Sequence, residues 1–196
     1  QLTTKNTIEQ LKAFTSIMEW TKEKMNFNPL SDKIVMIEGT DVHTGDSEDI
    51  IAKDIGAMTF KGGDASIPFL EMTIFGKLFW FFHHGAAAGY SYNSGSGLYG
   101  FIKSIYFDRL ADGKQPPHFV VTAHTHKHNH QIYENNGHQV HGLILPPFQE
   151  KTSFVNKIKT AIVHPTKMGF SPVVVYPSGE IKVLSPYLME MPLSEK

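Results

Sequence analysis

The sequence has no cysteine, no long apolar run and almost no net charge, and each absence narrows what the chain can do. Without cysteine there are no disulfides and no thiolate ligands, so a metal would have to bind histidine, aspartate, glutamate or asparagine. No stretch reaches the ~18 consecutive apolar residues of a membrane helix and no signal peptide is visible, so we expect a cytoplasmic protein without a membrane partner. The formal net charge of -1 provides no strong basic field for nucleic acid, although a local basic groove stays open.

Histidine is abundant, with 11 in 196 residues, and seven of them lie between His118 and His141. Hydrophobic residues make up 41% of the chain and charged residues 19%, a composition that allows a globular chain to bury a core. The length suits one domain or a large part of one, and we expect residues 1–196 to belong to a single domain.

The spacing of apolar residues predicts an α/β fold. Junctions rich in glycine and asparagine at residues 62–64, 76–77 and 135–137 predict tight turns, and the tail from residue 186 is expected to fray. The expected helices are residues 7–25, 47–56, 98–110 and a short one at 152–159. The expected strands are residues 33–38, 57–60, 66–75, 77–82, 120–123, 131–134, 139–145, 172–176 and 180–184.

Three of these strands end in polar loops that carry histidine. His43, His83 and the pair His124 and His126 each follow a predicted strand. Because ligands of α/β sheets bind beyond the carboxyl ends of the strands, neighbouring strands would bring these loops to one edge. In an extended segment residues i and i+2 point the same way, which would aim His124 and His126 at one point. Imidazole is a common metal ligand, so we expect a metal site; the alternative is a strand end whose polar residues simply leave the core.

The order of these loops resembles the later motifs of the calcineurin-like metallophosphoesterases. Residues 123–126 (Ala-His-Thr-His) are similar to the Gly-His-x-His motif of that family, and His83 falls at its isolated metal-binding histidine. Residues 39–43 (Gly-Thr-Asp-Val-His) resemble the Gly-Thr-x-x-His of a branch that includes virus-encoded members described as phosphatases or DNA-repair exonucleases. Glu48 and the Pro-x-x-Gln-x-Lys-Thr pattern of residues 146–152 fit the same branch.

The resemblance implies both a fold and a cofactor. The fold would be an αββα arrangement, in which a β-sandwich is flanked by helices. The cofactors would be two divalent metal ions (Mn, Fe, Zn or Mg), with His83 and His124 on the second metal and His126 on the first. The implied reaction is hydrolysis of a phosphoester substrate.

Residues 39–43 are the candidates for the remaining roles at the site. The usual asparagine ligand is absent, so Thr40, Asp41 or His43 would replace it, or that metal would be held more weakly. His43 is alternatively a general acid that protonates the leaving alkoxide, because imidazole titrates near neutral pH. We therefore expect Asp41 and His43 to be the catalytic residues.

The first two motifs of the family, Asp-x-His and Gly-Asp, have no match before residue 33. We expect the chain to begin after half of its active site, so that it lacks the N-terminal βαβ portion of the fold and forms the C-terminal two-thirds of the domain. The alternative is a compressed site, because Asp41-Val42-His43 is formally Asp-x-His and Gly63-Asp64 is formally Gly-Asp.

These features predict a two-metal phosphoesterase for phosphodiesters, with nucleic acid as one candidate substrate and the oligomeric state open. The second hypothesis is a catalytically incomplete phosphoesterase fold that serves as a scaffold or interaction module and binds one metal or none. The third is a single-zinc hydrolase, although no His-Glu-x-x-His pattern supports it.

Residues near the predicted site have two open interpretations. Tyr90, Tyr92, Asn93 and Tyr99 either stack on nucleobases or pack against the protein. His128 and His130 continue the alternation of histidines and are expected only to decorate the loop.

Overall fold

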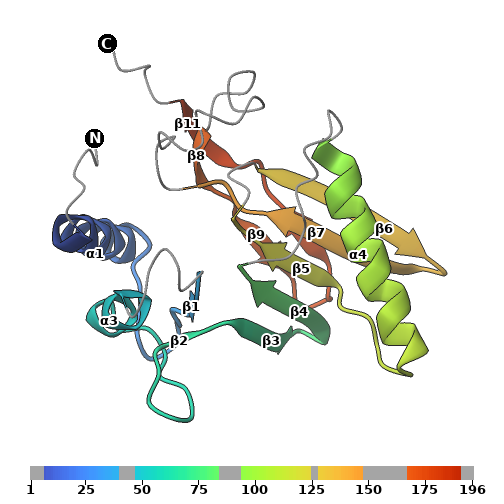
Figure 1. Ribbon diagram of the computed structural model, residues 1–196, viewed down its shortest axis with the longest axis horizontal. Helices are drawn as coiled ribbons and strands as arrows, with labels where there is room; N and C mark the ends of the chain where they lie inside the picture. The colour runs from blue at the N-terminus through green and yellow to red at the C-terminus, as the bar shows by residue number, and fades with distance from the viewer. Residues whose placement is uncertain (1–6, 40–46, 84–93, 125–127, 148–166, 191–196) are drawn as a thin grey trace. The chain divides into compact units, whose positions relative to one another are not determined.

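The computed structural model describes residues 7–39, 47–83, 94–124, 128–147 and 167–190. The chain forms two compact units, Gln1–Phe69 and Leu70–Lys196, which Figure 1 colours from blue to cyan and from green to red. None of the described helices combines the length and the apolar character that a membrane crossing requires.

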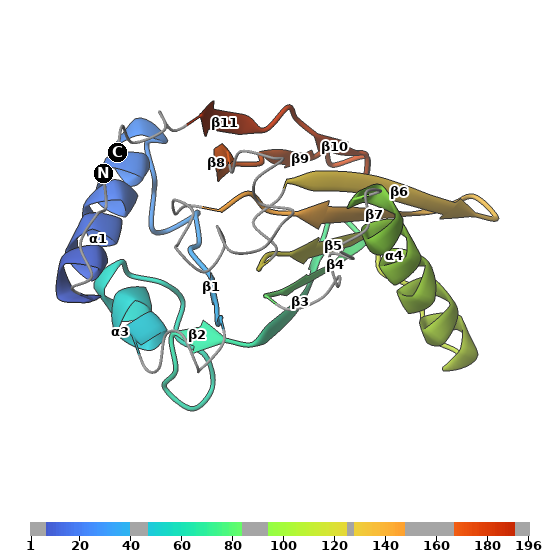
Figure 2. The ribbon, with the colours of Figure 1, turned by 45° about the horizontal axis from the view of Figure 1, so that its top comes forward.

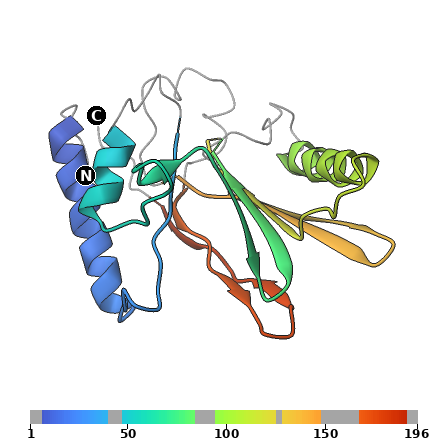
Figure 3. The same cartoon turned by 90° about the horizontal axis from the view of Figure 1, so that it is seen from below.

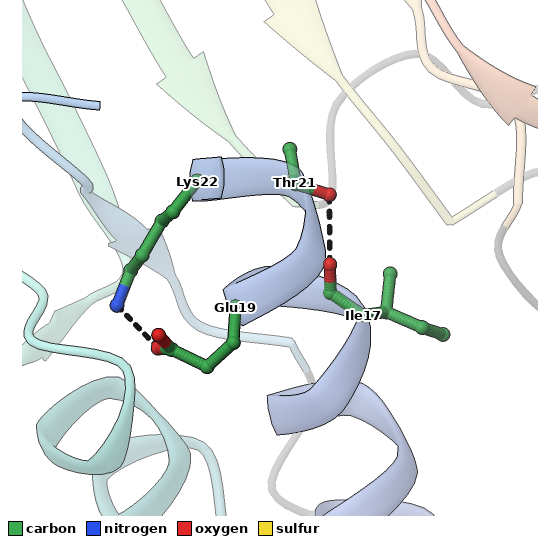
Figure 4. A network of polar contacts seen from close by, with 4 residues as sticks. All are labelled: Ile17, Glu19, Thr21 and Lys22. Carbon is green, nitrogen blue, oxygen red and sulfur yellow. Dashed lines mark hydrogen bonds and ion pairs between the residues drawn. The ribbon is translucent and has the colours of Figure 1, made fainter. Parts of the chain in front are cut away.

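The first unit begins with helix α1 (Thr7–Lys24), as predicted. Polar contacts one turn apart occur in its last turns (Figure 4): Lys22 Nζ lies 2.5 Å from Glu19 Oε1, and Thr21 Oγ1 donates to the Ile17 carbonyl at 2.8 Å. The exposed ion pair contributes a few tenths of a kcal/mol, whereas a threonine bond to the carbonyl four residues back does not stabilise a helix. The apolar side of the helix therefore has to supply most of its stability.

A short βαβ arrangement follows in the same unit. Strand β1 (Met36–Ile37) and strand β2 (Ser66–Ile67) pair in parallel, with Met36 opposite Ser66, and helix α3 (Ser47–Asp54) connects them. Ala52, Ile55 and Ala65 are buried, so the apolar side of α3 contributes to the core of this unit.

A five-stranded mixed sheet is the centre of the second unit (Figure 1), and its strand order is β3-β4-β5-β7-β6. Strands β4, β5 and β7 run parallel to one another, whereas β6 pairs antiparallel with β7. The bounds are β3 (Phe69–Ile74), β4 (Lys77–Phe82), β5 (Phe119–Thr122), β6 (Asn129–Asn135) and β7 (His138–Ile144).

Both faces of this sheet are covered, as Figure 3 shows. Helix α4 (Ser94–Ala111) packs Leu98, Ile102 and Tyr106 on one face, against a cluster that includes Val120. The hairpin of β9 (Val173–Val175) and β10 (Ile181–Val183) packs on the other face, against a cluster that includes Phe119. A strand buried on both sides needs consecutive apolar residues, which explains the Phe-Val-Val run of β5. The predicted α/β class is therefore confirmed, with helix, sheet and hairpin as its layers in this unit.

Two strands of the second unit were not predicted from the sequence. Strand β8 (Lys167–Phe170) pairs antiparallel with β11 (Tyr187–Glu190), and the two lie side by side in Figure 2. The expectation that the tail frays from residue 186 was therefore wrong for residues 187–190. Phe170 stacks on Tyr187 with ring centres 5.4 Å apart, which adds a cross-strand aromatic contact to the ladder.

Two other strand predictions need correction. Residues 57–60 form no strand, because their N–H groups bond to carbonyls of a helix end, a loop and a turn: Ala57 to Ala52, Met58 to Ile34 and Phe60 to Asp64. The strand predicted at residues 66–75 is interrupted at Pro68, which has no N–H for a ladder. The helix predicted at residues 152–159 lies outside the described residues.

A matched pair of glycine substitutions tests how closely α4 approaches the sheet. A Cβ on Gly142 of β7 would lie 2.7 Å from Ile102 Cγ2 and 3.0 Å from Leu98 Cδ1, whereas a Cβ on Gly100 of α4 would have nothing within 4 Å. We expect G142A to lower the free energy of unfolding by about 1–3 kcal/mol through overpacking. G100A should raise it by about 0.5–1 kcal/mol, because alanine is the better helix former. Urea unfolding of both variants measures the difference, and an unchanged G142A would contradict the close packing.

Candidate functional site

Two of the predicted histidines come together at one edge of the five-stranded sheet. His83 directly follows β4, and His124 lies two residues beyond β5. Because β4 and β5 are parallel neighbours, with Phe81 opposite Val121, their carboxyl ends lie side by side. The pairing continues past the strands, since Ala123 N–H donates to the His83 carbonyl at 3.1 Å. The apolar runs therefore set the register that brings the two imidazoles to the same edge.

The two rings have a separation that suits a shared metal. Their centres lie 5.1 Å apart and their planes are inclined by 74°. Two imidazoles that bind one zinc-like ion through bonds of about 2.0–2.1 Å at a tetrahedral angle have ring centres about 5 Å apart. An edge-on contact between two rings has a similar separation, so the two arrangements must be distinguished by measuring metal binding.

His124 has an uncommon backbone conformation, with a φ of 70°. Strand β5 ends at Thr122, so the segment is no longer extended at His124. The prediction that an extended alternation aims His124 and His126 at one point was therefore wrong at His124. A left-handed residue that is not glycine costs about 1 kcal/mol, and such strain is most often retained where a side chain has a task. Here the turn directs the imidazole of His124 toward His83.

The remaining predicted site residues lie outside the described residues: Asp41, His43 and His126. The same holds for Tyr90, Tyr92 and Asn93, whereas Tyr99 is described and packs edge-on against Tyr133, with ring centres 5.7 Å apart. Within the part of the chain that the structure describes, no group of three or more His, Asp or Glu side chains could hold a metal. His83 and His124 would thus be two ligands of an incomplete set.

In the first unit, carboxylates support the start of the loop that carries Asp41 and His43. Gly39 N–H donates to Glu48 Oε1 at 2.8 Å, and Ser66 Oγ donates to Glu38 Oε1 at 3.2 Å. Glu48 stands in the first turn of α3, where a carboxylate is also favoured by the helix dipole. Glu48 therefore ties the end of the β1 segment to α3 at Gly39, directly before residues 40–43.

Removing this tie is expected to affect the phosphoesterase reaction proposed below more than the fold. We expect Glu48→Ala to lower the metal-dependent turnover of that proposed reaction by about tenfold, since one charge-assisted hydrogen bond contributes about 1.5–3 kcal/mol to holding Gly39. Glu48→Gln retains the accepting oxygen and should keep most of the turnover. Steady-state kinetics with thermal melting as a control measures both, and equal losses in the two variants would contradict a positioning role.

A second group of histidines, His118, His138 and His141, lies toward the opposite, amino-terminal edge of the same sheet, and His118 and His138 have ring centres 4.5 Å apart. His130 stands opposite Leu143, nearer the carboxyl edge, and its Nε2 lies 3.3 Å from His141 Nδ1. His130 belongs to β6 and pairs across the sheet with β7, so the expectation that it only decorates a loop was wrong. The sequence shows these histidines as a dense stretch, but only the β6–β7 register brings His130 and His141 together.

Burial is the main electrostatic influence on two histidines of this group, His118 and His141. It lowers the pKa of His118 to about 4, helped by the nearby His138, Lys77 and His141. It also lowers the pKa of His141 to about 4, helped by His130. These imidazoles are therefore neutral at neutral pH.

The sequence and the fold were compared with known proteins. No protein-family model matches the chain, and no curated protein matches it. A crystal structure of Vps29 from Entamoeba histolytica complexed with Zn²⁺ is similar, with 15% sequence identity and a TM-score of 0.41, over 81% of this chain and 84% of that chain. The chemistry of the site is accordingly inferred from this chain's own residues.

Proposed function

We propose that the chain is a metal-dependent phosphoesterase that acts on phosphodiesters, with its centre at the carboxyl edge of β4 and β5. The observation that supports this most is the meeting of His83 and His124, whose ring centres are 5.1 Å apart. The pair coincides with two loops that resemble the His and Gly-His-x-His motifs of the calcineurin-like metallophosphoesterases. That resemblance also supports the choice of reaction.

His83 and His124 would hold one divalent cation, and His126 would contribute to a second. The bound ions would neutralise charge on the phosphoryl oxygens and lower the pKa of a water molecule, so that hydroxide is available as the nucleophile near neutral pH. Asp41 would take the place of the family's asparagine ligand, and His43 would donate a proton to the leaving alkoxide. Glu48 would hold the start of their loop through Gly39 N–H.

Hydrolysis of bis(p-nitrophenyl) phosphate by the full chain tests the proposal. Turnover should require added Mn²⁺, cease with a chelator and return when the metal is restored. A chain that binds metal but does not turn over this ester, a monoester or an oligonucleotide would contradict it. Cleavage of the oligonucleotide would add nucleic acid as a substrate class, a point on which the net charge of -1 provides no support.

A scaffold that binds one metal or none is the competing function. This function is favoured because His83 and His124 are only two candidate ligands, and among the described residues no carboxylate joins them to form a group that could hold a metal. Metal analysis of the dialysed protein separates the two functions, since the enzyme needs two ions per chain. One ion or none, together with absent turnover, would establish the scaffold.

A further inference from the structure

The second histidine group borders a cavity of about 230 Å³ that has no part in the proposed reaction. Its polar lining comes from the starts of β4, β5 and β7 and from the β9–β10 turn: Lys77, His118, His138, Gln139, His141 and Glu180. His118 and His124 lie beyond opposite ends of β5, which puts them on the order of 15–20 Å apart. The cavity is therefore separate from the metal-binding edge.

Lys77 supplies the positive charge of this cavity. Among the described residues it forms no ion pair within 4.0 Å, although Glu180 also lines the cavity. Its side chain passes close to the β9–β10 turn, where a Cβ on Gly179 would lie 2.8 Å from Lys77 Cε. Gly179, with a φ of 81°, thus leaves room for the lysine stem, and the ammonium group remains available to a ligand.

His118 supplies a hydrogen-bond donor, and its contacts define which ring nitrogen carries the proton. Leu78 N–H donates to His118 Nδ1 at 3.1 Å, so the neutral ring carries its proton on Nε2. The backbone holds the ring in place, because His118 N–H donates to the Leu78 carbonyl and His141 N–H donates to the His118 carbonyl. Lys77 and His118 line the same cavity, so the ammonium and the imidazole can both face a ligand bound there.

We propose that this cavity binds a phosphate-type oxyanion, either free phosphate or the phosphoryl group of a small phosphomonoester, with Lys77 Nζ and His118 Nε2–H as donors. An ammonium without an ion pair beside a fixed neutral N–H donor suits an anion, and charge-assisted hydrogen bonds favour a dianion over a monoanion. A cation site is not supported, because no suitable group of three ligands occurs in the described part of the chain. Glu180 opposes the anion and weakens its binding.

Phosphate titration of the full chain, followed by NMR at the His118 ring and at constant ionic strength, tests this proposal. A chelator keeps phosphate from binding at a metal centre, so the result is independent of the proposed phosphoesterase activity. We expect a saturable shift that Lys77→Met weakens at least about tenfold and Lys77→Arg largely preserves. His118→Asn retains an acceptor for Leu78 N–H, but its shorter side chain cannot place an N–H donor at the position of the ring Nε2. The phosphate binding of this variant, followed at the ring of His141 in the same cavity, should weaken similarly.

Two further variants complete the test. Glu180→Gln removes the opposing charge and should tighten phosphate binding about threefold, whereas Lys103→Met, on the exposed side of α4, should change nothing. Phenyl phosphate should bind through the same residues. No saturable shift, equal binding by Lys77→Met, or binding of phenyl phosphate without binding of phosphate would each overturn the proposal.

Discussion

Replacing His124 with asparagine is expected to lower the proposed metal-dependent hydrolysis of phosphodiesters at least about a hundredfold, because even a residue that only supports a metal ligand usually contributes ten- to a hundredfold. Asparagine suits this position, since it tolerates the left-handed conformation that His124 adopts at a φ of 70°. The free energy of unfolding should therefore stay within about 1 kcal/mol of the parent chain. Kinetics with added Mn²⁺ and urea unfolding of the same preparation measure the two quantities.

His83→Asn provides the partner variant. If both imidazoles bind one ion, the double variant H83N/H124N should be little worse than either single variant, because residues that act as a unit are not additive. Metal analysis of each variant should show the loss of one ion. His124→Gly should be as inactive and as stable as H124N. This result would show that the loss of activity comes from the missing imidazole and not from a change in the backbone conformation. Activity of H124N within threefold of the parent chain would place the reaction elsewhere.

Much of the sheet that carries His83 and His124 could be predicted, because local patterns specify it. β4 and β5 are short apolar runs, and Asn136-Gly137 has the two positive φ values of the turn that joins β6 to β7. A histidine that follows such a run must lie near a strand end, so its position could be predicted without coordinates. The left-handed turn at His124 could not, because neither alanine nor histidine favours it strongly enough to be recognised from sequence.

The features that could not be predicted depend on pairing between strands that are distant in sequence. His118 and His138 are 20 residues apart in sequence. They meet because β5 pairs with β7, with Phe119 opposite His141, so the residues that begin the two strands lie close together. No spacing rule connects such residues. The same applies to β8 and β11. The last residues of a chain are expected to fray, and β11 forms a strand because β8 pairs with it.

Acidification is expected to destabilise the second unit already above the pH at which carboxylates titrate. His118 and His141 have a pKa of about 4 in the folded chain and about 6.5 when unfolded. Between pH 6.5 and about 4 the unfolded chain binds more protons than the folded chain, so the free energy of unfolding falls as the pH falls through this range. Well above pH 6.5 both histidines are neutral in both states, and they make no pH-dependent contribution to the free energy of unfolding. Each residue contributes up to about 3 kcal/mol to this loss.

His141→Phe isolates one of these contributions. Phenylalanine retains the ring that stacks on Phe119, whose centre lies 5.6 Å away at 8°, but it cannot take up a proton. At pH 7 the variant should be less stable by about 1 kcal/mol, because His130 Nε2 loses its partner 3.3 Å away. Near pH 4.5 it should be more stable than the parent chain by about 1–2 kcal/mol, so the two stability curves cross. Urea unfolding between pH 4 and 8 would show the crossing, and parallel curves would mean that His141 is protonated as readily in the folded chain as in the unfolded one.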